Sequence, residues 1–182
     1  WEDRSALEPL ALSTRESVLD VGCGTGELTA VLREESDGVV YALDRDRSLL
    51  EGVADPRLQG DALSLPLADD AVDLVVCQAL LVNLPDPTAT LSEFRRVASE
   101  HVAAIEPDNA NVAVSSSVPS EERLAERARE HYLAGVETDP TLGALTERFE
   151  AAGLSEVTVR RHEHVQHVTP PYDDAALEAA RR

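Results

Sequence analysis

Short apolar runs alternate with helical patterns along the first half of the chain. The apolar runs predict strands, and spacings of three and four residues predict helices from Glu27 to Glu35, from Ser48 to Val53 and from Pro87 onward. Because the two kinds of element take turns, the pattern favours an α/β fold with a parallel sheet. The strands are expected at residues 17–21, 39–43, 58–59, 72–77 and 102–105, with 72–77 central and buried on both faces.

The second half is more charged and less regular. A helix is predicted at 120–133, with Leu124, Ala128 and Leu133 facing inward, and a second helix at 141–152 that stops at Gly153. The valines of 157–159 and 165–168 indicate a strand near the far edge of the sheet. A last helix is expected at 173–182.

Composition excludes several classes of function. The 182 residues carry a net charge of −19, and all 16 basic residues are arginine, so we expect no broad basic face for nucleic acid or anionic membranes. No apolar run is long enough for a membrane-spanning helix, and no signal peptide is recognisable. Two cysteines make no disulfide framework, which favours a cytoplasmic location. The acidic, lysine-free composition is typical of a salt-adapted protein, although an ordinary acidic protein is the alternative.

The most specific signal is the segment 18–26, Val-Leu-Asp-Val-Gly-Cys-Gly-Thr-Gly. A predicted strand runs into a turn with three glycines, Gly22, Gly24 and Gly26, and a helix follows at once. Such a turn lets backbone amides approach a ligand, and the helix N-terminus favours negative charge. The spacing differs from the dinucleotide fingerprint, and the phosphate loop needs a lysine that this chain lacks.

Two acidic residues sharpen this interpretation. Asp44 ends the second predicted strand, and Asp61 ends the third. The carboxyl ends of parallel strands form the ligand-binding edge of such folds, and an acid in the position of Asp44 can accept both ribose hydroxyls. We therefore expect both acids at the same edge of the sheet as the glycine turn.

These segments together resemble the class I S-adenosylmethionine-dependent methyltransferases, within the small-molecule group that includes ubiquinone and menaquinone biosynthesis enzymes. The resemblance rests on 18–26, Asp44, Gly60-Asp61-Ala62, the stretch 65–76, Leu84-Pro85-Asp86-Pro87 and Ile105-Glu106-Pro107. It implies a Rossmann-like, doubly wound and mostly parallel sheet of the seven-stranded type, flanked by helices and truncated at its C-terminal edge. It also implies one domain over 1–182, with a cofactor core at 1–110 and a substrate-side insert with edge elements at 111–182.

The resemblance further implies a methyl transfer from S-adenosylmethionine to a small acceptor, with S-adenosylhomocysteine as product. In-line displacement at a sulfonium methyl depends mostly on positioning. The residues expected to bind the cofactor are Asp20, Gly22, Cys23, Gly24, Gly26, Asp44, Arg45, Asp61, Ala62, Cys77 and Gln78. Asn83, Glu106 and Asn109 are candidates for the substrate side. No catalytic residue is assigned, and the oligomeric state stays open.

Departures from the family pattern keep alternatives open. Val82 and Asn83 stand where many relatives have two histidines, so an inactive cofactor-binding or regulatory protein is one alternative. A nicotinamide-dependent oxidoreductase is a rival enzyme class, which the glycine spacing and the second acid, Asp61, disfavour. His162, His164 and His167 are interpreted as solvated side chains rather than metal ligands, because they do not share one strand face.

Overall fold

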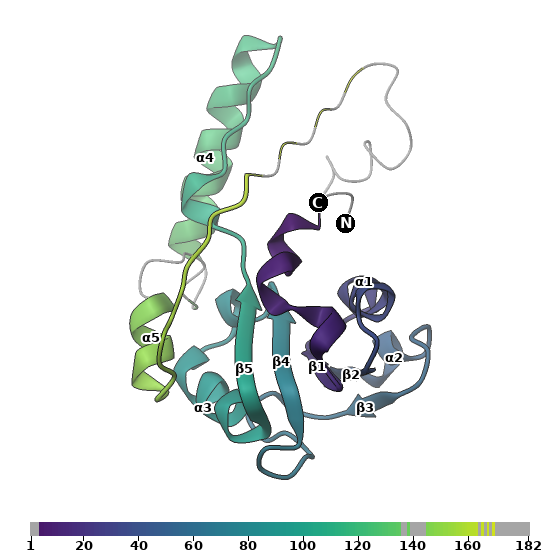
Figure 1. The fold of residues 1–182 in the computed structure, drawn as a ribbon. Coiled ribbons are helices and arrows are strands. Elements are labelled where there is room, and N and C mark those ends of the chain that lie inside the picture. Colours follow the sequence, from purple (N-terminus) through teal and green to yellow (C-terminus); the bar gives the residue numbers. More distant parts are fainter. Residues whose placement is uncertain are drawn as a thin grey trace.

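The computed structural model describes residues 4–135, 138, 145–163, 165, 167 and 169. Its centre is a five-stranded parallel sheet in the order β3-β2-β1-β4-β5 (Figure 1). The strands are β1 (Ser17–Val21), β2 (Val39–Asp44), β3 (Arg57–Gln59), β4 (Val72–Gln78) and β5 (Ala98–Ile105). This order reverses between β1 and β4, as in Rossmann-like folds. It confirms the predicted α/β class with a shorter sheet than the seven-stranded type.

Helices cover both faces of the sheet. The α-helices are α1 (Glu27–Glu35), α2 (Arg47–Leu50), α3 (Pro87–Val97), α4 (Pro119–Gly135) and α5 (Leu145–Ala151). Short 3₁₀ helices are η1 (Ser5–Leu10), η2 (Leu12–Thr14), η3 (Leu81–Asn83) and η4 (Asn109–Asn111). No helix in the described ranges is both long and apolar enough to cross a membrane.

Side-chain alternation along β1 divides the core into two layers. Val18 packs with Leu28 and Leu32 of α1, whereas Leu19 packs on the opposite face, in the layer that contains Phe94 of α3. All five side chains are buried. Leu91, Phe94 and Val97, which recur at three-residue spacing in the helix predicted from Pro87, are fully buried in the second layer.

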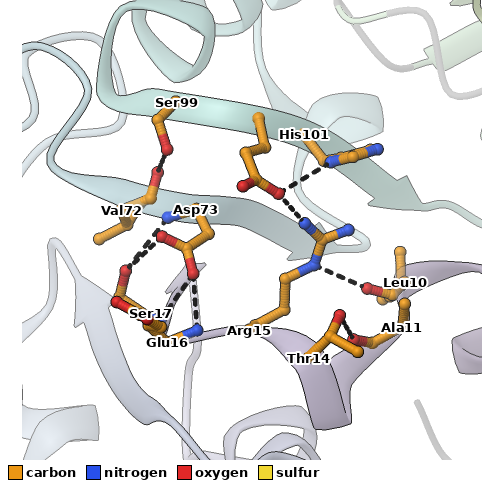
Figure 2. Close-up of polar contacts among 11 residues, drawn as sticks. Leu10, Ala11, Thr14, Arg15, Glu16, Ser17, Val72, Asp73, Ser99 and His101 are labelled. Atoms are coloured by element: carbon orange, nitrogen blue, oxygen red, sulfur yellow. Dashed lines mark hydrogen bonds and ion pairs between the residues drawn. The ribbon is translucent and has the colours of Figure 1, made fainter.

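The amino ends of β1 and β4 are joined through one carboxylate. Asp73 accepts hydrogen bonds from the amides of Glu16 (2.6 Å) and Ser17 (3.1 Å) and from the Ser17 hydroxyl (3.0 Å), as Figure 2 shows. Beside it the buried Arg15 pairs with Glu100 and donates to the carbonyl of Leu10 (3.0 Å). This network lies at the amino edge of the strands, opposite the edge expected to bind ligand.

Two boundaries in the first half were predicted wrongly. The helix expected at 48–53 is the shorter α2, which begins after Asp46, whose side chain accepts from the Ser48 amide (2.8 Å). It ends at Leu50, and the Arg57 guanidinium donates to the carbonyls of residues 50, 51 and 53, so these carbonyls have partners outside the helix. The strand expected at 102–105 begins earlier, at Ala98, since Ala98 and His101 already pair with β4.

The second half departs further from expectation. Helix α4 extends away from the sheet beyond β5 (Figure 1), so Leu124 and Ala128, expected inward, are exposed, and Leu133 is half-buried. Helix α5 ends at Ala151 and Gly153 follows with a φ of +83°, as predicted; residues 141–144 lie outside the described ranges.

The edge strand expected from Val157 onward is also wrong for the described residues. Residues 157–163, 165 and 167 form no strand, and 166, 168 and the helix predicted at 173–182 lie outside the described ranges. The segment makes side-chain contacts rather than strand pairing. Arg161 pairs with Asp108 at 3.2 Å, and His162 Nδ1 lies 3.4 Å from Ser5 Oγ. His164 lies outside the described ranges, so the interpretation of His162, His164 and His167 as solvated side chains is not tested for the three together.

Candidate functional site

The glycine turn between β1 and α1 has a shape that only glycine adopts without strain. Gly22, Gly24 and Gly26 have φ values of +72°, +54° and +86°. The amides of Gly22 and Cys23 both donate to the carbonyl of Leu43, at 2.8 and 3.0 Å. The end of β2 thus fixes the start of the turn.

Space around the glycines differs from one to the next. A Cβ at Gly22 would lie 2.9 Å from Leu80 Cδ1, and one at Gly26 would lie 3.0 Å from Val53 Cγ2, so both glycines allow close packing. A Cβ at Gly24 would meet nothing within 4 Å. The middle of the turn therefore borders open space.

That space is a pocket of about 240 Å³ at the carboxyl edge of β1 and β4. Its volume is below the roughly 300 Å³ at which pockets for whole small ligands begin, so it suits one part of a larger ligand. It is lined by Asp20, Gly22, Cys23, Gly24, Thr25, Glu27, Leu28, Gln78 and Ala79. Five of the residues predicted for the cofactor lie in this lining.

Asp20 supplies a buried carboxylate to the pocket. It is 1% exposed, and one oxygen accepts a hydrogen bond of 2.6 Å from the Thr29 hydroxyl. Burial raises the pKa of Asp20 to about 6, although the bond from Thr29 and the charge of Arg33 oppose the rise. A cation beside Asp20 would offset the cost of burying this charge.

Asp44 lies beside the turn, as predicted. Its Oδ2 accepts from the amide of Gly24 and its Oδ1 from the amide of Asp46, both at 2.8 Å. Each carboxylate oxygen can still accept a second hydrogen bond. Arg45, the next residue, is exposed.

Asp61 and Ala62 lie on the same edge of the sheet but outside the pocket lining. Strand β3 ends at Gln59, and Asp61 forms a turn in which its side chain accepts from the amide of Leu63 at 2.9 Å. The preceding Gly60 donates to the carbonyl of Asp44 at 3.1 Å, which ties this turn to β2. Asp61 is exposed, and Ala62 is half-buried.

The two cysteines are neutral thiols. Burial, reinforced by Asp20 and Asp44, raises the pKa of Cys23 to about 12. Burial and the neighbouring Glu106 raise the pKa of Cys77 well above its ordinary value. Cys23 lines the pocket and is anchored through its backbone, whereas Cys77 is fully buried beneath Gln78, which lines the pocket.

Glu106, a candidate for the substrate side, contacts the backbone after β4. Its carboxylate accepts from the amides of Leu80 and Leu81, each at 3.0 Å, and of Val82 at 3.3 Å. Burial raises the pKa of Glu106, and these amides oppose the rise. Glu106 thus fixes the loop that carries Leu80 against Gly22. Asn83 is exposed and donates to the carbonyl of Ala79 at 2.7 Å, while the half-buried Asn109 lies in η4.

Sequence reasoning missed Thr25, Glu27, Leu28 and Ala79 of the pocket lining, and Thr29 beside it. Thr29 is a polar side chain 1% exposed on α1, beside the buried Leu28, and a hydroxyl on the apolar face of a predicted helix was a usable signal. Ala79 lines the pocket with a φ of +48°, and nothing in its sequence context marks it.

The chain resembles known methyltransferases in sequence. Residues 19–105 match the family described as "Methyltransferase domain". A demethylmenaquinone methyltransferase of Mycolicibacterium vanbaalenii is 30% identical over 180 residues, covering 86% of this chain and 76% of the relative. The chain belongs to the class I S-adenosylmethionine-dependent methyltransferases. The halophilic origin expected from composition has no support among these relatives.

Other relatives of this methyltransferase chain match over shorter stretches. The demethylmenaquinone methyltransferase of Bacillus velezensis is 29% identical over 132 residues, covering 65% of this chain and 53% of the relative. The chain thus spans about half the length of the first curated relatives that it matches.

Among solved structures, the fold is shared with a Bacillus halodurans protein. The TM-score is 0.63 at 19% identity, over 84% of this chain and 69% of that one. A SAM-dependent methyltransferase of Aquifex aeolicus gives a TM-score of 0.54 at 23% identity, over 71% and 77%. These two likenesses concern the fold alone.

Proposed function

We propose that this methyltransferase chain binds S-adenosylmethionine at the glycine turn and transfers its methyl group to a small-molecule acceptor. The observation that carries the proposal is the turn itself, with three left-handed glycines, open space at Gly24 and carboxylates on both sides. Family membership supports the same conclusion.

The residues present fit the cofactor. Asp20, buried and lining the pocket, would accept the ammonium of the amino-acid part, and the amides at the start of α1 would favour its carboxylate. Asp44 would bind the ribose hydroxyls, with Arg45 beside it. Asp61 and Ala62 would receive the adenine, and Gln78, above Cys77, would close the pocket after β4.

Positioning is the main contribution of the protein to the reaction. S-adenosylmethionine supplies an already activated methyl group, and a fixed pocket holds donor and acceptor in line. We assign no general base. Asn83, Glu106 and Asn109 remain proposed for the acceptor side; since Glu106 already accepts three backbone amides, its part there is to shape the loop.

The substrate class, the location and the organisation of the chain are also proposals. Quinone methyltransferases among the relatives support a small metabolite as acceptor. We propose one domain over 1–182, with a cofactor core at 1–110 and a substrate-side part at 111–182. The net charge of −19 and the absence of lysine support a salt-adapted, cytoplasmic protein without nucleic-acid partners.

Thermal unfolding in high salt tests the proposal. S-adenosylhomocysteine at about 100 times its dissociation constant should stabilise the fold by roughly 2.7 kcal/mol and raise Tm by about 5 to 10 °C. NAD at the same concentration should leave Tm unchanged. No shift with S-adenosylhomocysteine at millimolar concentration, while the fold is intact, would refute the proposal. A shift with NAD alone would favour the oxidoreductase.

An inactive cofactor-binding protein is the second candidate. It is favoured by Val82 and Asn83, because neither side chain has an ionisable group that could act as an acid or base. Transfer of a labelled methyl group to any acceptor in a panel of quinols and other small metabolites would exclude it. Cofactor binding without transfer to any acceptor in the panel would favour it.

A further inference from the structure

Thr29 is one of two buried threonines in the described ranges, and it lies next to the pocket. It sits in the first turn of α1 and is 1% exposed, yet its hydroxyl donates to the Asp20 carboxylate on β1 at 2.6 Å. Hydroxyls in helices often bond back to a carbonyl of their own helix. This one instead joins α1 to the acid beneath the glycine turn.

The other groups that face Asp20 do not replace this contact. Arg33, on the same helix, acts through its charge, while its guanidinium donates to the carbonyls of Val40 and Pro56, each at 3.1 Å. Asp44, at the end of β2, repels the Asp20 charge. Cys23 in the turn and Cys77 on β4 are neutral thiols. Among the described residues, Thr29 is therefore the hydrogen-bond donor to this carboxylate.

A fixed, ionised carboxylate is what an ammonium group requires. The Thr29 hydroxyl donates to Oδ2 of Asp20. Because Asp20 lines the pocket, its Oδ1 is left to accept a hydrogen bond from a ligand there. The bond from Thr29 favours the charged form of Asp20 over the protonated form. Without it, only the charge of Arg33 would oppose the effects of burial and of Asp44 on this acid.

We infer that Thr29 is a positioning residue, which holds Asp20 ionised and oriented so that it receives the ammonium of the cofactor. This inference rests on the proposed function, because it concerns the same pocket. It assigns to a residue outside the glycine turn a share in setting the pH range over which the cofactor binds.

The pH dependence of binding follows from the sign of the effect. The pKa of Asp20 is raised to about 6, so binding should weaken as pH falls below about 6. The Thr29 hydroxyl stabilises the charged form of Asp20, so its loss should move this midpoint upward by about one pH unit or more. The deficit of a variant without the hydroxyl should grow as pH falls.

Calorimetric titration of the full chain with S-adenosylhomocysteine from pH 5.5 to pH 8 tests the inference. Thr29→Val, which has nearly the same shape, should bind about tenfold more weakly at pH 5.5 and within about twofold of the unaltered protein at pH 8. Thr29→Ser restores the hydroxyl and should follow the unaltered profile. Thr29→Ala takes the place of the valine variant if the latter fails to fold.

Thr90→Val is the matched control. Thr90 is 0% exposed on α3, and its hydroxyl donates to the carbonyl of Asp86 at 3.2 Å, away from the pocket. This variant should lose stability without a change in the pH midpoint. A Thr29→Val deficit of equal size at every pH, or no deficit at all, would overturn the inference while leaving the proposed function intact. Absence of binding by the unaltered protein at every pH would instead overturn both.

Discussion

The amide of Gly24 donates a 2.8 Å hydrogen bond to Oδ2 of Asp44. This bond joins the turn after β1 to the end of β2, so the two strongest signals in the sequence form one unit. Gly24 is also the glycine that borders open space. The Asp44 carboxylate therefore has two proposed roles. It accepts the hydrogen bond that fixes the turn at Gly24, and it would bind the ribose hydroxyls of the cofactor.

Replacing Asp44 should remove cofactor binding. Asp44→Ala removes the carboxylate proposed to accept two ribose hydroxyls, and a hydrogen bond to a charged group contributes about 1.5 to 3 kcal/mol, so affinity for S-adenosylhomocysteine should fall at least about 100-fold. The variant also loses the bonds from the amides of Gly24 and Asp46, so its stability is measured beside its affinity. High salt, which screens repulsion among surface acids, should not restore the affinity. Titration calorimetry at low and high salt measures this effect. Asp37→Ala, at an exposed acid before β2, is the control and should bind normally; an equal loss in that control would contradict the assignment.

Asp20 should cost stability in the absence of ligand. Its folded-state pKa is raised from 3.8 to about 6, so the folded state holds the proton more tightly, and stability falls as pH rises between these values. The full difference is about 3 kcal/mol. The free energy of unfolding of Asp20→Asn, measured in urea and compared with that of the unaltered protein, should therefore increase by about 2 kcal/mol from pH 4.5 to pH 7.5. The variant should also lose cofactor binding. A constant difference across this range would contradict the account.

Asp73 should stabilise the fold without affecting the site. Burial tends to raise its pKa, but the amides of Glu16 and Ser17 and the Ser17 hydroxyl outweigh it, so the pKa is lowered. This contribution is present above the ordinary pKa and is lost as pH falls. Asp73→Ala should cost about 1 to 3 kcal/mol at pH 7. Ser17→Ala should cost less, because both amide bonds remain. Urea unfolding measures both changes; a changed cofactor affinity in either variant would contradict a purely structural role.

The cysteines should be chemically inert. With a pKa of about 12 for Cys23 and a fully buried Cys77, neither thiol is ionised at pH 8. Iodoacetamide should label the native protein far more slowly than the unfolded protein, and Cys23→Ala should keep cofactor affinity within about threefold. Rapid native labelling of Cys23, detected by mass spectrometry, would refute this.

Local pattern was sufficient for the sheet core and for the glycine turn. The strands around Val18 and Leu74 carry apolar residues on both faces of the sheet. The three glycines indicate backbone with positive φ, which other residues rarely adopt. The length of α2 was not predictable, because it ends on carbonyls taken by Arg57 from the next strand. Nor did the sequence predict that Leu124 would be exposed, since amphipathic spacing does not say whether a neighbour is present.

The site shows the same division. Asp44 was predicted from its place at the end of a strand, and Asp20 from the family resemblance of the segment 18–26. Glu106 and Thr29 act through contacts between elements distant in sequence, and these contacts exist only once the sheet is assembled. Glu106 was expected at the substrate, but its carboxylate meets the backbone amides of residues 80–82. The position of Glu106 after the fifth strand indicated the edge of the sheet at which it lies, but not the backbone amides that it contacts.

A crystal structure with bound S-adenosylhomocysteine tests the central claim most directly. The account predicts electron density with the amino group at Asp20, the amino-acid part against Gly24 and the ribose hydroxyls at Asp44. Density for the ligand at any other place on the chain, or none from crystals grown at saturating ligand, would contradict it.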